Sequence, residues 1–88
     1  MKAIFRSSFL RDLKKLREKS VRSRVKDCVE QVENAVGLSE IPNLIKISGA
    51  TGHYRIRIGD YRAGLVVEQD AVIFVRCLHR RDIYRYFP

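Results

Sequence analysis

The chain has 88 residues, of which 45% are hydrophobic, and its 18 lysines and arginines outnumber ten aspartates and glutamates to give a formal net charge of +8. This length supports one small hydrophobic core, so we expect a single domain over residues 1–88. No apolar run approaches the roughly 20 residues of a membrane-spanning helix, and charges as early as Arg6 and Arg11 argue against a signal peptide, so we expect a soluble cytoplasmic protein.

A short strand and a helix are predicted at the start of the chain. Residues 2–6, KAIFR, show the alternation that is typical of a strand. Ser7 or Ser8 is a suitable N-cap for the helix, because either hydroxyl can accept a hydrogen bond from a backbone N–H of the first turn. The helix is indicated by apolar residues at helical spacing, which are Phe9, Leu10, Leu13 and Leu16.

A second helix is predicted from about residue 21 to residue 36, with Gly37 placed to terminate it. Its apolar stripe consists of Val21, Val25, Cys28, Val29, Val32 and Val36. Because residues 19–23 leave only a short connection, we expect the two helices to form an antiparallel hairpin that covers one face of a sheet. The outward basic residues fit a solvated helix face better than a binding patch; they are Lys14, Lys15, Arg17, Lys19, Arg22, Arg24 and Lys26.

From residue 44 onward the pattern changes to the alternation of strands. We predict strands at residues 44–47, 53–58, 61–68 and 71–78, joined by short turns. An antiparallel meander is the simplest arrangement, with the last strand central because it is apolar on both faces. The tail after residue 78 leaves the sheet as a turn or a short helix. The expected fold class is α+β: an N-terminal short strand and a helical hairpin packed on a twisted antiparallel sheet of four to five strands.

Three arginines gather on one face of this predicted sheet. If Gly59–Asp60 is a two-residue turn, Arg57 lies opposite Arg62. Arg55 then lies opposite Gly64 on the same face, while the alternate residues are mostly apolar and pack under the hairpin. Like charges in register cost up to about 1 kcal/mol, so an anionic ligand explains the pattern better than a solvated surface does. Glycine at 64 would also allow a ligand or backbone to approach closely.

The charge balance limits the class of partner. A strongly basic small domain favours an anionic partner, with nucleic acid first, an acidic protein segment second, and a basic surface without a specific partner as the third possibility. Cys28 and Cys77 lie in apolar patterns, which predicts buried thiols rather than a disulfide. Because the two histidines and two cysteines lack ligand spacing, we expect no metal site and no cofactor.

A family resemblance is carried by HYRIRIGDYRAGLVVE at residues 53–68, by the hydrophobic strand after it, and by HRRDIYR at residues 79–85. Together with the short strand and basic hairpin before them, these features resemble the RelE/ParE superfamily of toxin–antitoxin toxins over essentially the whole chain. RelE-like members cleave messenger RNA in the ribosomal A site, whereas ParE-like members inhibit DNA gyrase. The resemblance implies a RelE-like mRNA endoribonuclease held by a cognate antitoxin. A non-catalytic gyrase inhibitor and a nucleic-acid-binding module without catalysis are the alternatives.

The resemblance also implies a set of site residues. Arg55 and Arg57 fall where RelE-like toxins carry basic residues, usually lysines. The tail between Arg80 and Tyr84 is shorter than in the best-known members. The implied site consists of Arg55, Arg57, Arg62, Arg80 and Tyr84, with Arg81 as an alternative to Arg80.

The chemistry expected of these residues is assisted self-cleavage of RNA without a metal ion. A ribose 2′-hydroxyl attacks the adjacent phosphorus, and a protein accelerates this step by orienting the attack, stabilising negative charge and moving protons. Arginines bind phosphate and stay charged, so they stabilise charge but are poor bases. The proton is left to Tyr84, which the resemblance favours, or to His79, whose imidazole exchanges protons readily near neutral pH.

Overall fold

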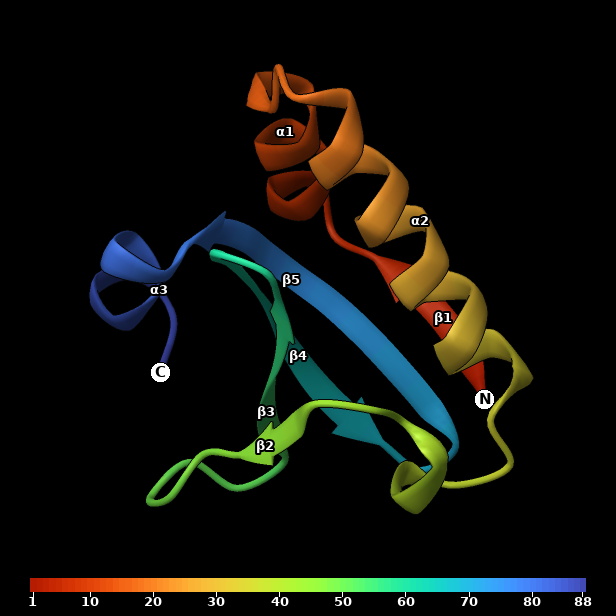
Figure 1. The fold of residues 1–88 in the computed structure, drawn as a ribbon. Coiled ribbons are helices and arrows are strands. Elements are labelled where there is room, and N and C mark those ends of the chain that lie inside the picture. The colour runs from red at the N-terminus through yellow and green to blue at the C-terminus, as the bar shows by residue number, and fades with distance from the viewer.

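The computed structural model describes all 88 residues and contains a five-stranded sheet in the order β1-β5-β4-β3-β2. The strands are β1 (Lys2–Phe5), β2 (Leu44–Lys46), β3 (His53–Ile58), β4 (Tyr61–Glu68) and β5 (Ala71–His79). The helices are α1 (Ser7–Lys15), α2 (Lys19–Asn34) and α3 (Arg80–Tyr86), with a 3-10 helix at Leu38–Glu40. Figure 1 shows α1 and α2 together on one side of the sheet and α3 at the far end of β5. This confirms the α+β class. No helix combines the length and the apolar character needed to cross a membrane.

The sheet is mixed, whereas the sequence predicted an antiparallel one. β2 to β5 form the predicted antiparallel meander; β5 is an internal strand between β1 and β4, and β4 is the middle strand. β1, however, pairs in parallel with β5, with Ile4 opposite Ile73. Alternation in residues 2–6 indicates a strand but says nothing of its direction. The direction is set by the three-dimensional path of the chain, in which α1 follows β1 directly and packs back against β5.

The helix ends differ from the prediction. α2 begins at Lys19, so residues 19–23 belong to the helix and the connection is only residues 16–18. It ends at Asn34, before Gly37, and Val36 is 88% exposed rather than part of the buried stripe. An apolar pattern begins at its first apolar residue, so it cannot reveal a polar first turn.

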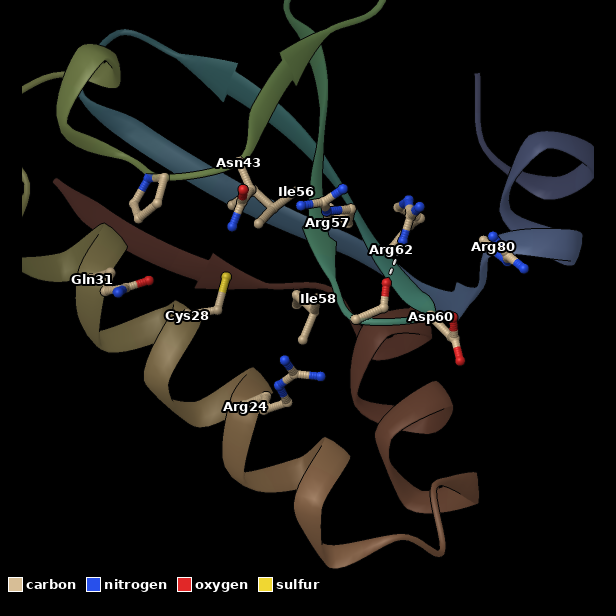
Figure 2. Close-up of a pocket in the computed structure, with 12 residues that line it drawn as sticks. Arg24, Cys28, Gln31, Asn43, Ile56, Arg57, Ile58, Asp60, Arg62 and Arg80 are labelled. Atoms are coloured by element: carbon tan, nitrogen blue, oxygen red, sulfur yellow. Dashed lines mark hydrogen bonds between the residues drawn. The ribbon is translucent and has the colours of Figure 1, made fainter.

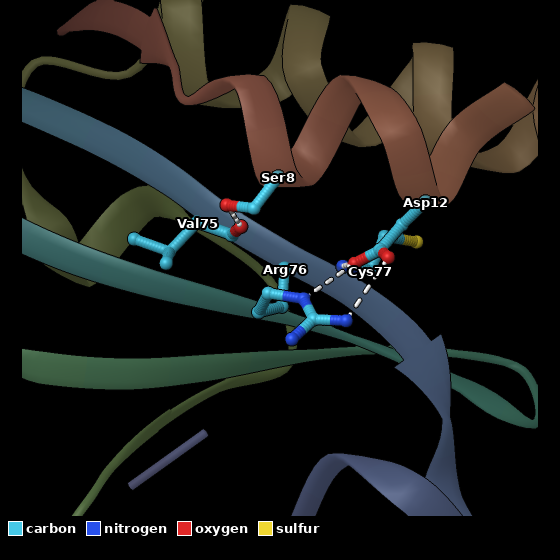
Figure 3. A network of polar contacts seen from close by, with 5 residues as sticks. All are labelled: Ser8, Asp12, Val75, Arg76 and Cys77. Atoms are coloured by element: carbon cyan, nitrogen blue, oxygen red, sulfur yellow. Dashed lines mark hydrogen bonds and ion pairs between the residues drawn. The ribbon is translucent and has the colours of Figure 1, made fainter. Parts of the chain in front are cut away.

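The predicted serine cap of α1 is also wrong. The N-cap is Arg6, which makes no side-chain capping hydrogen bond. The Ser8 hydroxyl instead donates to the carbonyl oxygen of Val75 at 2.6 Å, which ties the start of α1 to β5 (Figure 3). This choice follows from tertiary packing, which a local capping rule does not describe.

The hydrophobic core lies between the helical hairpin and the sheet. Phe9 of α1 and Val32 of α2 are fully buried against Leu65 and Phe74 of the sheet. Each such side chain contributes about 1.5 to 3 kcal/mol through removal from water. The alternate residues of β3 and β4 face this core, as predicted; the buried ones are Ile56, Ile58, Ala63 and Leu65.

Both cysteines are buried and unpaired, as the apolar patterns predicted. Burial raises the pKa of the Cys28 thiol to about 11 and that of Cys77 to about 12, because a thiolate is poorly solvated in an apolar interior. Both thiols are therefore protonated at neutral pH, which makes them weak nucleophiles.

One buried carboxylate joins α1 to β5, and no sequence pattern indicates it. Asp12 is 5% exposed and accepts hydrogen bonds from Arg76 at 2.8 Å (Nε) and 3.1 Å (Nη2) (Figure 3). The backbone N–H of Cys77 donates to the same carboxylate at 2.9 Å. The bond to Asp12 raises the pKa of Arg76 above its ordinary value. This is the only ion pair in the chain.

We expect Asp12→Ala to lower the free energy of unfolding by about 3 kcal/mol, because it leaves a buried N–H and a partly buried guanidinium without their partner. Urea denaturation followed by circular dichroism measures this loss. Asp27→Ala, which removes an exposed carboxylate from α2, is the matched control and should stay within about 0.5 kcal/mol of the wild type. Equal stabilities of the two variants would contradict a structural role for Asp12.

Candidate active site

The turn between β3 and β4 is the centre of the candidate site. Gly59 has a φ of 60°, a left-handed conformation that glycine adopts at low cost, and the predicted two-residue turn forms. Arg57 lies opposite Arg62, as the register predicted. The backbone N–H of Arg80, the first residue of α3, donates to the carbonyl oxygen of Asp60 at 2.7 Å. Each of β3, β4 and α3 therefore brings one arginine to this turn.

An open pocket of about 500 Å³ lies beside the turn (Figure 2), and we call it the arginine pocket. It is lined by Arg57, Arg62 and Arg80 and by a fourth arginine, Arg24 of α2. Asp60 is the only acidic residue in its wall, so four arginines and one aspartate leave a formal charge of +3. None of these arginines forms an ion pair. The pocket is therefore a concave, cationic surface whose charge Asp60 neutralises only in part.

Arg62 is held in place by the turn itself. Its Nη1 donates to the carbonyl oxygens of Gly59 at 2.8 Å and Tyr61 at 2.9 Å. These bonds fix the guanidinium beside the pocket and leave its Nε and Nη2 groups without a protein partner. A guanidinium fixed in this way binds a phosphate at a smaller cost in side-chain entropy.

Arg55 and Tyr84 form a second group on the outer face of the sheet. The Arg55 Cζ lies 4.6 Å from the centre of the Tyr84 ring, within the range of a cation–π contact. Tyr84 is 61% exposed, so its hydroxyl can be reached from solvent. Because Arg80 and Tyr84 are four residues apart in α3, they share a face of that helix. Arg55 and Tyr84 are thus in contact with each other, but neither lines the arginine pocket.

The space above Gly64 is not open to a ligand. Gly64 lies opposite Arg55, as predicted, but a Cβ at this position would come within 2.6 Å of the Phe87 ring. The close approach that glycine permits is made by the protein's own tail. Phe87 is 5% exposed, so this contact anchors the end of α3 on the sheet.

His79 and Arg81 lie outside the arginine pocket. The Nδ1 of His79 accepts a hydrogen bond from the backbone N–H of Arg81 at 3.2 Å and so caps α3. The His79 ring meets the Tyr61 ring edge-on at 5.5 Å, in a different hollow that Asp12 and Arg76 also line. Of the two neighbouring arginines in the tail, the structure brings Arg80 to the pocket.

Arg24 was not identified from the sequence, which assigned it to the solvated helix face. Its signal is positional, because Arg24, Cys28 and Gln31 are spaced by four and three residues and share the side of α2 that meets the sheet edge. No group of three or more histidine, cysteine, aspartate or glutamate side chains lies close enough to hold a metal ion. The chemistry that the pocket offers is the binding and stabilisation of phosphate.

Comparison with known proteins identifies the family and the fold of this chain. Residues 3–84 match the family model for the ParE toxin of type II toxin–antitoxin systems, parDE. Toxin RelE3 of Methanocaldococcus jannaschii is 42% identical over 89 residues, which cover all of both chains. The RelB–RelE antitoxin–toxin complex from Methanococcus jannaschii is similar with a TM-score of 0.81 and 40% identity, over 97% of this chain and 99% of that chain. The archaeal RelE–RelB complex from Pyrococcus horikoshii OT3 shares the fold, with a TM-score of 0.72 and 22% identity over 90% and 93% of the chains. The chain therefore belongs to the ParE/RelE family of toxins of type II toxin–antitoxin systems.

Proposed function

We propose that the protein is an endoribonuclease that cleaves messenger RNA in the ribosomal A site, in the cytoplasm, and that a RelB-like antitoxin neutralises it. The observation that carries this proposal is the arginine pocket, in which Arg57, Arg62 and Arg80 converge without ion-pair partners. The relatives at 42% and 40% identity are named RelE, which favours messenger RNA as the target. The match to a ParE family model is the one observation that favours DNA gyrase.

The arginines serve the reaction by binding the scissile phosphate. The 2′-oxygen forms a bond to phosphorus while the bond to the 5′-oxygen breaks, which leaves a cyclic phosphate and a 5′-hydroxyl. Negative charge grows on the phosphate oxygens in the transition state, where fixed guanidinium groups stabilise it. We assign this role to Arg57, Arg62 and Arg80. Neither a metal ion nor a cofactor takes part.

Two protons also have to move in this reaction. One leaves the 2′-hydroxyl and one joins the departing 5′-oxygen. We assign proton transfer to Tyr84, because it shares a face of α3 with Arg80 and its hydroxyl is accessible. Arg55 stands over the Tyr84 ring and holds it through a cation–π contact.

The antitoxin is proposed from the charge of the chain and from its relatives. Two solved relatives are complexes with RelB. The formal charge of +8 and the cationic arginine pocket favour an antitoxin segment with acidic side chains that covers the site. Such a segment blocks RNA binding because it binds the same arginines.

Expression of the protein alone is expected to arrest growth, because the site is complete as soon as the chain folds. Mapping of transcript ends should reveal new cuts within messengers, while the supercoiling of a plasmid stays unchanged. Co-expression of the cognate antitoxin is the control and should restore growth. Normal growth at high soluble expression would contradict a toxin, and altered supercoiling with intact messengers would identify a gyrase inhibitor instead.

A further inference from the structure

The arginine pocket has a second wall that the proposed reaction does not use. β2 begins at Leu44, which pairs with Ile56, so Arg57 and Ile58 of β3 extend beyond the end of their neighbouring strand. α2 lies across this open edge and contributes Arg24, Cys28 and Gln31 to the pocket (Figure 2). The volume of about 500 Å³ falls within the roughly 300 to 1,000 Å³ of small-molecule sites.

Arg24 is positioned in this wall without any acidic partner. A Cβ on residue 59 would overlap the Nη1 of Arg24, so the guanidinium lies directly against the turn and its approach depends on glycine at that position. Arg24 makes no ion pair and shares the pocket with three other guanidinium groups. Asp60 offsets only part of their mutual repulsion, and an anion between them would offset more of it.

Two side-chain amides line the end of the pocket away from Arg80. Figure 2 shows Asn43 and Gln31 there, facing the gap between the sheet edge and α2. Asn43 has a φ of 62°, which is uncommon for any residue but glycine. The main-chain carbonyl oxygen of Asn43 accepts a hydrogen bond from the backbone N–H of Arg57 at 3.3 Å. This bond fixes the Asn43 backbone beside the arginines.

The arrangement of charged and polar groups along the two walls matches that of a nucleotide. Guanidinium groups at one end suit a phosphate, and amides at the other end can donate to and accept from the edge of a base. Between them, the lining includes Cys28, Ile56 and Ile58, which expose small apolar edges against which a base ring can pack.

We propose that the arginine pocket, besides binding the scissile phosphate, contains a subsite for the RNA nucleotide next to the cleaved bond. Arg24 binds the phosphate of this nucleotide from the helix side, and Gln31 and Asn43 read its base. The inference rests on the proposed function and extends it, because it assigns sequence preference to residues that take no part in the chemistry.

Binding of an uncleavable RNA tests the phosphate contact. A short oligonucleotide with 2′-O-methyl groups lacks the attacking hydroxyl, and its affinity can be measured by fluorescence anisotropy at several salt concentrations. Arg24→Ala should weaken binding by about tenfold and lower the salt dependence by about one phosphate contact. Lys26→Ala removes the same charge from α2 outside the arginine pocket and should weaken binding less than about twofold. The thermal unfolding curves of both variants should coincide with that of the wild type, since the Arg24 and Lys26 side chains are exposed.

Mapping of cut sites tests the base contact. Gln31→Ala and Asn43→Gly should change the preferred base beside the cut by about tenfold, and glycine at 43 keeps the left-handed backbone. Glu33→Ala on the same helix is the control and should leave the cut pattern unchanged. If Arg24→Ala and the amide variants behave like their controls in both assays while the wild type cleaves RNA, the subsite is wrong and the proposed function stands. If the wild type never cleaves but binding depends on Arg24, the phosphate subsite stands and the cleavage function fails.

Discussion

Arg62→Ala and Arg80→Ala are each expected to slow cleavage of ribosome-bound messenger by about 30- to 1,000-fold in single-turnover assays. This loss corresponds to about 2 to 4 kcal/mol of transition-state stabilisation, the amount typical of one fixed donor to a developing oxyanion. The two variants should differ in their structural cost. Arg80 is exposed, whereas Arg62 also bonds the carbonyl oxygens of Gly59 and Tyr61, so Arg62→Ala additionally loosens the turn.

A helix lysine gives the matched control for these two arginines. Lys15→Ala removes one exposed positive charge from α1, outside the arginine pocket. It should weaken RNA binding in a salt-dependent way and leave the single-turnover rate at saturating ribosomes unchanged. Arg62→Lys keeps the positive charge but loses the bidentate hydrogen-bond donor. The cleavage rate of this variant should therefore lie between those of the wild type and Arg62→Ala. Equal, small effects at all of these positions would show that the arginines form only a diffuse electrostatic surface.

The β3–β4 hairpin could be predicted because its rules are local. A Gly-Asp pair between two alternating segments sets a two-residue turn, and the turn fixes the register that places Arg57 opposite Arg62. The repulsion between these arginines indicates an anionic ligand without reference to any tertiary contact. The tail was predicted only as a turn or a short helix, and the internal position of β5 depends on its long-range pairing with β1.

The contacts that were missed are those between segments far apart in the sequence. Asp12 binds Arg76, which lies 64 residues later in the sequence. Neither residue belongs to a sequence pattern that indicates a buried ion pair. Arg24 meets the turn at Gly59 because α2 crosses the open edge of β3. Phe87 fills the space above Gly64, where the strand pattern alone suggested room for a ligand. Periodicity reports which side chains face inward, but not which partner each one meets.

The two candidates for proton transfer stand in different surroundings. Tyr84 lies under the Arg55 guanidinium and shares a helix face with Arg80, and its ring is largely exposed. His79 uses its Nδ1 to cap α3 and packs its ring against Tyr61, in the hollow that Asp12 and Arg76 also line. An imidazole engaged in capping a helix is poorly placed to exchange protons with a phosphate bound by the arginines.

Tyr84→Phe is therefore expected to reduce the single-turnover rate of cleavage by about 100-fold or more, the effect typical of an acid–base group. The substitution keeps the ring and its contact with Arg55 and removes only the hydroxyl, so binding of an uncleavable RNA should change little. His79→Gln should lower the free energy of unfolding by about 1 kcal/mol through loss of the cap and slow cleavage by less than about tenfold. If Tyr84→Phe cleaves at the wild-type rate while a folded His79→Gln is inactive, the imidazole moves the proton and the assignment of Tyr84 is wrong.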